Sequence, residues 1–105
     1  MARMTRQELE EMLEAKGFKY LGSYIASDCS ILNWVRPTED GQFEVASADG
    51  WLGNWEPYIR KIDKERLYRL VERIMSEGAP SVWAVIGERE RRARCDIYLN
   101  RMGVL

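Results

Sequence analysis

The chain has 105 residues, of which 46% are hydrophobic and 31% are charged, with a formal net charge of −1 and no histidine. Four tryptophans, five tyrosines and two phenylalanines supply enough aromatic area for a packed core, which excludes a disordered chain. The length is that of one globular domain, residues 1–105, and it is too short for two independent cores.

The first predicted element is a helix over residues 6–16. Thr5 and Glu8 have the spacing of a capping box, in which each side chain accepts a hydrogen bond from the backbone N–H of the other residue. Residues 9–13 place leucine and methionine on one face at helical spacing. Gly17 suits the left-handed position that follows a helix, so we expect the helix to end there.

Three strands are expected next, at residues 18–25, 31–36 and 43–47. The first two segments are rich in aromatic and branched apolar side chains, and the third alternates residues between its two faces. Turn-forming residues separate the strands at 27–30 and 38–41. Because both connections are short, the three strands are predicted to form an antiparallel meander.

A second helix is expected to begin after Asp63 and to end at Gly78. Residues 48–62, which precede it, fit neither the helical nor the strand period and are typical of a structured loop. Asp63 is a favourable N-cap, and the apolar residues between positions 67 and 74 recur at helical spacing. Gly78 ends the helix and Pro80 prevents it from resuming.

The C-terminal part is predicted to add a second hairpin. Residues 82–86 form an apolar run and residues 93–99 alternate in character, so both segments are assigned to strands that meet at a charged turn over 88–91. The competing interpretation is a helix over residues 88–101, because glutamate and arginine favour helices. The hairpin is preferred because apolar spacing decides structure more strongly than surface charge does.

Together these elements predict an α+β fold in the order α-β-β-β-α-β-β. A single antiparallel sheet of about five strands, with two helices packed on one face, buries the apolar stripes of both helices. No internal repeat or low-complexity segment interrupts this order.

The first candidate site is the Trp-rich loop, residues 50–58. Tryptophan and tyrosine offer large contact areas with few torsions to freeze, and the glycines beside them allow close backbone approach, so the loop is a candidate surface for binding another protein. The competing interpretation is that Trp51 and Trp55 turn inward and complete the core. The candidate partner-binding residues are Trp51, Asn54, Trp55 and Tyr58, with Arg60 and Lys61 at the rim.

The second candidate site is basic. Arginines recur at intervals of three and four residues along the second helix, and more arginines lie between positions 89 and 94. Such residues suit phosphate or nucleic-acid contacts, whereas the glutamates among them are typical of a solvated helix face or a charged hairpin tip. The candidate phosphate contacts are Arg66, Arg69, Arg73, Arg91, Arg92 and Arg94.

The sequence contains no recognisable catalytic or metal-binding pattern. It has no P-loop, no dinucleotide-binding glycine motif and no nucleophile elbow. Two cysteines without histidine cannot complete a zinc site, and Cys29 has no histidine to act as its base. We therefore expect no catalytic residue, no metal and no cofactor. An enzyme that uses only carboxylates or lysine is a third hypothesis, to which no residue spacing points.

Targeting signals are also missing from the pattern of the sequence. The N-terminal segment lacks the apolar stretch of a signal peptide, and the longest apolar run, residues 82–86, is too short to span a bilayer. The low cysteine content agrees with a cytoplasmic location. The leading hypothesis is a small non-enzymatic protein-binding module, such as an inhibitor, adaptor or regulatory subunit, with a homodimer as a further expectation and no membrane partner. The alternative hypothesis is nucleic-acid or nucleotide binding through the basic residues.

Overall fold

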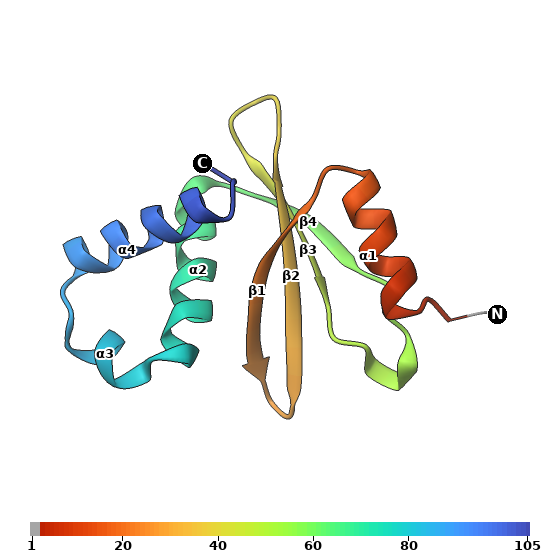
Figure 1. The fold of residues 1–105 in the computed structure, drawn as a ribbon, viewed down its shortest axis with the longest axis horizontal. Coiled ribbons are helices and arrows are strands. Elements are labelled where there is room, and N and C mark those ends of the chain that lie inside the picture. The colour runs from red at the N-terminus through yellow and green to blue at the C-terminus, as the bar shows by residue number, and fades with distance from the viewer. Residues whose placement is uncertain (1–2) are drawn as a thin grey trace.

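Residues 3–105 are described by a computed structural model, in which four α-helices, one 3₁₀ turn and four strands follow one another along the chain (Figure 1). In chain order these elements are α1 (Arg6–Ala15), β1 (Lys19–Ala26), β2 (Cys29–Pro37), β3 (Phe43–Ala48), η1 (Trp51–Gly53), β4 (Tyr58–Ile62), α2 (Lys64–Gly78), α3 (Pro80–Val85) and α4 (Glu88–Arg101). The four strands form one antiparallel sheet, so the predicted α+β class is confirmed.

Local sequence determines where α1 begins and ends. The Thr5 hydroxyl accepts a hydrogen bond from the Glu8 N–H at 3.1 Å, and the Glu8 carboxylate accepts one from the Thr5 N–H at 3.1 Å, which is the predicted capping box. Gly17 is left-handed with φ 86°, and the Phe18 N–H donates back to the Leu13 carbonyl at 2.9 Å. The predicted first helix is therefore confirmed.

The sheet is a meander in the order β1-β2-β3-β4. The three predicted strands correspond to β1, β2 and β3. The fourth strand, Tyr58–Ile62, lies inside the segment 48–62 that is predicted to be a loop. It is 5 residues long, contains two cations and buries only Ile62, so it lacks the apolar alternation by which a strand is recognised in a sequence.

Helices cover both faces of the sheet, so the predicted arrangement with both helices on one face is wrong. Neighbouring residues of the central strands are buried together, as Trp34 is with Val35 in β2 and Val45 is with Ala46 in β3. Because successive side chains of a strand point to opposite faces, both faces are apolar and each needs a cover. α1 packs on the Trp34 face, and α2 packs together with α4 on the Val35 face (Figure 1).

The predicted strand at residues 82–86 is helical in the structure. Pro80 stands at the start of α3, where a helix tolerates proline because the missing N–H would have no partner there. Trp83 is buried, while Val82 and Val85 remain exposed. A short apolar run does not by itself distinguish a strand from a helix, and the proline before this run is compatible with the start of a helix.

The predicted strand at residues 93–99 is also helical, and the competing helix over residues 88–101 matches α4. Cys95 and Leu99, four residues apart, are fully buried, whereas Ile97 between them is 53% exposed. A strand would place all three side chains on one face, but a helix turns the middle one outward. The sheet therefore has four strands instead of about five.

Stability measurements test the two-sided arrangement of the core. We expect Leu13→Ala, on the α1 face, to lower the free energy of unfolding by about 2–5 kcal/mol and Ile62→Val, on the α2 face, to lower it by about 0.5–1.5 kcal/mol. Since the two residues belong to separate apolar clusters, the double variant should lose the sum to within about 0.5 kcal/mol in urea unfolding. A departure from additivity of more than about 1 kcal/mol contradicts two separate clusters.

Candidate functional site

The loop between β3 and β4 is fastened to the N-terminal segment. The Met4 N–H donates to the side-chain oxygen of Asn54 at 3.1 Å, and the Trp55 N–H donates to the Met4 carbonyl at 2.9 Å. The Arg3 guanidinium donates to the Leu52 carbonyl. These bonds join segments about 50 positions apart in the sequence, so they hold the loop in one conformation.

Trp55 supports the loop from beneath. Its partly buried ring packs against the apolar cluster between α1 and the Trp34 face of the sheet, and the Arg6 guanidinium lies 5.4 Å from the centre of the ring. Gly50 lies against this ring with φ 67°, and a Cβ at Gly50 would lie 2.4 Å from the nearest ring atom. Glycine is therefore required at this position both by the backbone conformation and by the close approach.

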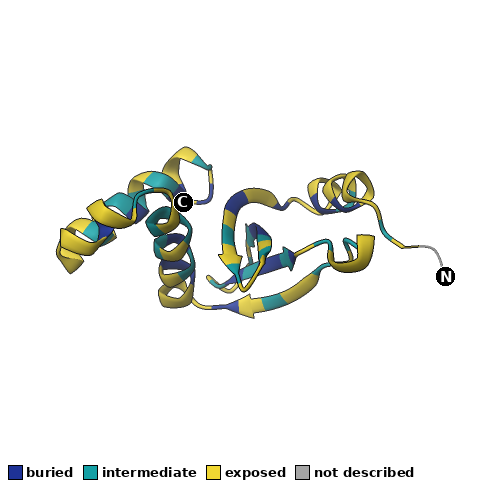
Figure 2. Cartoon of the chain, turned by 90° about the horizontal axis from the view of Figure 1, so that it is seen from below, coloured by how far each residue is buried: buried dark blue, intermediate teal, exposed yellow. Residues whose placement is uncertain are grey.

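Trp51 and Leu52 point away from this support, and their side chains are 64% and 66% exposed. Figure 2 shows the turn that carries them, η1, as an exposed segment beside α1. Leu52 has φ 56°, a left-handed conformation that costs a residue with a Cβ about 1 kcal/mol or more. Stability of the fold does not explain an exposed leucine in a strained backbone, so the turn is a candidate contact surface.

The other predicted partner-binding residues have different surroundings. Tyr58 is 69% exposed at the start of β4. The Asn54 side chain accepts a hydrogen bond from the Met4 N–H and so helps to fix the loop conformation. Like Trp55, it is half-buried. Arg60 donates to a serine hydroxyl of β3 at 2.9 Å, and Lys61 forms an ion pair with an aspartate of the β2–β3 turn.

Leu52 is absent from the predicted set although it is as exposed as Trp51. A signal for it exists in the sequence, because Gly50 and Gly53 enclose two adjacent large apolar residues in a segment without helical or strand period. Glycines in this spacing predict a tight turn, and a tight turn gives two neighbouring apolar side chains no common face to bury.

Most of the predicted phosphate contacts are engaged within the chain. Ring, carboxylate or carbonyl partners are present for Arg73, Arg91, Arg92 and Arg94. Arg66 and Arg69 are exposed on α2. The six arginines therefore do not present their full charge to one surface, which weakens the case for a phosphate-binding site.

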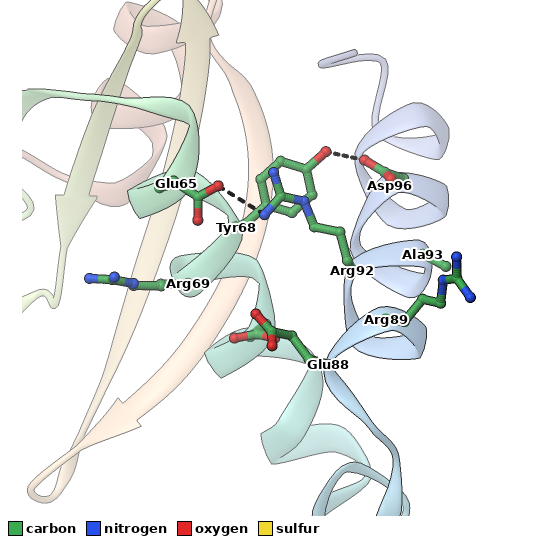
Figure 3. A pocket seen from close by; sticks show the side chains of 9 residues that line it. Glu65, Tyr68, Arg69, Glu88, Arg89, Arg92, Ala93 and Asp96 are labelled. Atoms are coloured by element: carbon green, nitrogen blue, oxygen red, sulfur yellow. Dashed lines mark hydrogen bonds and ion pairs between the residues drawn. The ribbon is translucent and has the colours of Figure 1, made fainter.

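An open cleft of about 580 Å³ separates α2 from α4 (Figure 3). The Tyr68 hydroxyl donates to Asp96, while the Arg92 guanidinium lies 3.6 Å from the centre of the Tyr68 ring and pairs with Glu65 at 3.0 Å. Burial and the bond to Asp96 raise the pKa of Tyr68, which keeps its hydroxyl a donor at neutral pH. These contacts join the two helices across the cleft, so the Glu65, Arg92 and Asp96 side chains are engaged within the chain.

Cys95 is a buried thiol at the same helix pair. Burial raises the pKa of Cys95 to about 11, and the charges of Glu72 and Asp96 act in the same direction, so the thiol is protonated and unreactive at neutral pH. No group of three or more potential metal-ligating side chains comes together within residues 3–105. None of the helices in this described range has the length and apolar character required to cross a bilayer.

Comparison with protein-family models, curated proteins and solved structures gave no match to this chain. The candidate site therefore rests on geometry. That geometry singles out the exposed turn at Trp51 and Leu52, which is held by the N-terminal segment and is followed along the chain by β4.

The contact between Gly50 and the Trp55 ring is testable by substitution. Gly50→Ala should lower the free energy of unfolding by about 2–4 kcal/mol, because a left-handed alanine is strained and its Cβ strikes the ring. Gly41→Ala is the matched control, since Gly41 has φ 82° but nothing within 4 Å of its Cβ position, and it should cost only about 1 kcal/mol. Equal losses in urea unfolding mean that Trp55 does not support the loop.

The buried thiol predicts selective alkylation. At pH 8 the folded chain should react with iodoacetamide at the partly exposed Cys29 and not at Cys95, whereas the chain in urea should react at both. Because the unfolded thiol loses its proton near pH 9.0 and the folded one near 11, this group's contribution to stability is present below pH 9.0 and is lost as the pH rises toward 11. Equal alkylation of both cysteines in the folded chain, read by mass spectrometry, contradicts this placement.

Proposed function

We propose that this chain is a small non-enzymatic protein-binding module whose contact surface is the turn at Trp51 and Leu52. The observation that carries the proposal is the outward position of these two apolar side chains on a backbone held in a strained conformation. Tyr58, at the start of β4, supplies further exposed aromatic area near the end of the same connection.

The physical basis of the proposal is preorganisation. Association must offset the entropy of ordering loops and side chains, and a loop that is already ordered loses less on binding. Hydrogen bonds to Met4 and the support of the Trp55 ring order this loop in the free chain. Tryptophan is also the residue type that most often dominates the energy of protein interfaces.

Charge supports a protein partner in preference to a nucleic acid. The formal net charge is −1, whereas a duplex-binding domain is usually strongly basic. Of the candidate arginines, Arg92 and Arg94 form ion pairs with glutamates, and two others donate to backbone carbonyls within the chain. The functional classes that fit such a surface are an inhibitor, an adaptor or a regulatory subunit, and we propose that it acts in the cytoplasm, in keeping with its two free cysteines.

The proposal is tested by capture from a lysate of the source organism. Trp51→Ala and Leu52→Asn remove the two apolar side chains, and asparagine tolerates the left-handed conformation at position 52. We expect each variant to weaken capture of the wild type's partner by about tenfold or more. The free energy of unfolding should change by no more than about 0.5 kcal/mol, because both side chains are exposed.

Val85→Ser is the matched control for this experiment. It removes an apolar side chain that is 82% exposed on α3, away from the loop, and it should leave capture unchanged. Wild-type capture by both loop variants, or an equal loss in the Val85 variant, contradicts the proposed surface.

A further inference from the structure

The two edges of the sheet are treated differently by the rest of the chain. At β1 the Ile25 N–H donates to the Glu77 carboxylate at 2.7 Å, and the Ile25 carbonyl accepts from Arg73 at 3.2 Å. The Leu21 carbonyl accepts from the Tyr98 hydroxyl. Side chains of α2 and α4 thus occupy backbone groups of β1 and close this edge to another strand.

The β4 edge is open. Within residues 3–105, the β4 backbone makes no hydrogen bonds apart from its pairing with β3. Figure 2 shows β4 running along the lower rim of the chain, between the exposed turn and α2. Alternate residues of an edge strand direct their N–H and C=O groups outward. A strand added here satisfies those groups, which is a recurrent mode of peptide recognition.

The charge on β4 restricts which strand can be added. Arg60 and Lys61 are consecutive, so their side chains lie on opposite faces of the sheet, and β4 contains no carboxylate. The register places Lys61 opposite Glu44, but Glu44 pairs with Arg36 at 2.8 Å. The edge therefore presents one cation on each face, and like charges directly opposite each other in a sheet are destabilising.

We propose that the β4 edge binds an extended, acidic segment of the partner protein as a fifth strand, with two consecutive acidic residues placed against Arg60 and Lys61. Consecutive residues are required because one carboxylate must reach each face of the sheet. This inference rests on the proposed function, since it makes β4 a second part of the surface that begins at Trp51 and Leu52.

The same cations disfavour some registers in which a second copy of this chain could pair with the edge. An antiparallel pair of β4 strands centred on Arg60 places Arg60 opposite its own counterpart and Ile59 opposite Lys61. A register centred on Lys61 places Lys61 opposite its own counterpart. Like charges oppose each other in both of these registers, whereas a register centred on Ile59 places Arg60 opposite Tyr58 and opposes no like charges. The cations therefore narrow the registers open to a second copy, and an acidic strand avoids the repulsion altogether.

An ion pair within the chain competes with the partner for Lys61. Lys61 forms an ion pair with Asp40, and both side chains are about half exposed. That pair also lowers the pKa of Asp40 to about 2, so the carboxylate is ionised at neutral pH and competes with an incoming acidic residue. Removing the Asp40 charge should free Lys61 for the partner.

The test uses two capped eight-residue peptides of alternating threonine and valine, one with a central Glu-Glu pair and the other with a central Lys-Lys pair. Binding is followed by NMR through shifts of the backbone amides of residues 58–62 and their protection from hydrogen exchange. We expect the Glu-Glu peptide to protect alternate amides of β4 and to bind about tenfold more tightly than the Lys-Lys peptide. Lys61→Gln should weaken its binding about threefold, and Asp40→Asn should strengthen it about threefold.

Arg101→Gln, which removes one exposed positive charge from α4, is the control and should not change binding. The inference is overturned if the Glu-Glu peptide does not bind, if it shifts amides outside β4 only, if both peptides bind equally, or if β4 amides are already protected in a dimer of the free chain. Each of these results leaves the lysate experiment at Trp51 and Leu52 intact, so failure of the strand and failure of the proposed function are distinguishable.

Discussion

Four successive residues of β2, from Leu32 to Val35, are buried although their side chains point alternately to the two faces of the sheet. The rest of the structure follows from this constraint, because a strand whose two faces are both buried must be covered on both, and Trp34 and Val35 present apolar side chains to opposite faces. α1 covers one face, and the helices after β4 cover the other. Side chains of α2 and α4 hydrogen-bond to the backbone of β1 and close that edge of the sheet. β4 and the loop before it then lie at the opposite edge, which remains open (Figure 1).

The same packing on the α1 face explains how the loop presents its apolar turn. Trp55 enters the cluster beneath α1, and the segment before α1 lies against the loop through the bonds to Met4. Because the Trp55 indole packs inward and hydrogen bonds hold the loop backbone, Trp51 and Leu52 do not pack against the core and remain exposed. The strain at Leu52 is therefore maintained by contacts elsewhere in the chain, a pattern found at sites whose conformation serves binding more than stability.

The elements that the sequence predicts correctly are those with local causes. Thr5, Glu8 and Gly17 determine α1 through their own hydrogen bonds and conformation, and Asp63 caps α2 by accepting from the Arg66 N–H at 2.8 Å. Features that depend on distant contacts escape prediction. β4 is a strand because it pairs with β3, and its two cations interrupt the apolar alternation by which a strand is recognised in a sequence. In α4, apolar residues two apart suggest a strand, and only packing against α2 shows that Ile97 is exposed.

The candidate site shows the same limit. A sequence indicates that Trp51 and Trp55 are unusual, but whether each turns inward or outward depends on an N-terminal segment about 50 positions away. The left-handed conformation of Leu52 likewise has no signature in its residue type, because leucine seldom adopts it. The basic candidates fail for a related reason, since their ring and carboxylate partners, such as Tyr68 and Glu65 for Arg92, come together only in the folded chain.

The central claim is that the Trp51 indole is exposed to solvent in the free chain and buried by the partner protein in the complex. Oxidative footprinting of the tryptophans, read by mass spectrometry for the free chain and for the captured complex, measures this directly. The account predicts that Trp51 is oxidised in the free chain and protected in the complex, while Trp34 and Trp83, which are buried, are protected in both. Protection of Trp51 in the free chain, or its unchanged oxidation in the complex, contradicts the account.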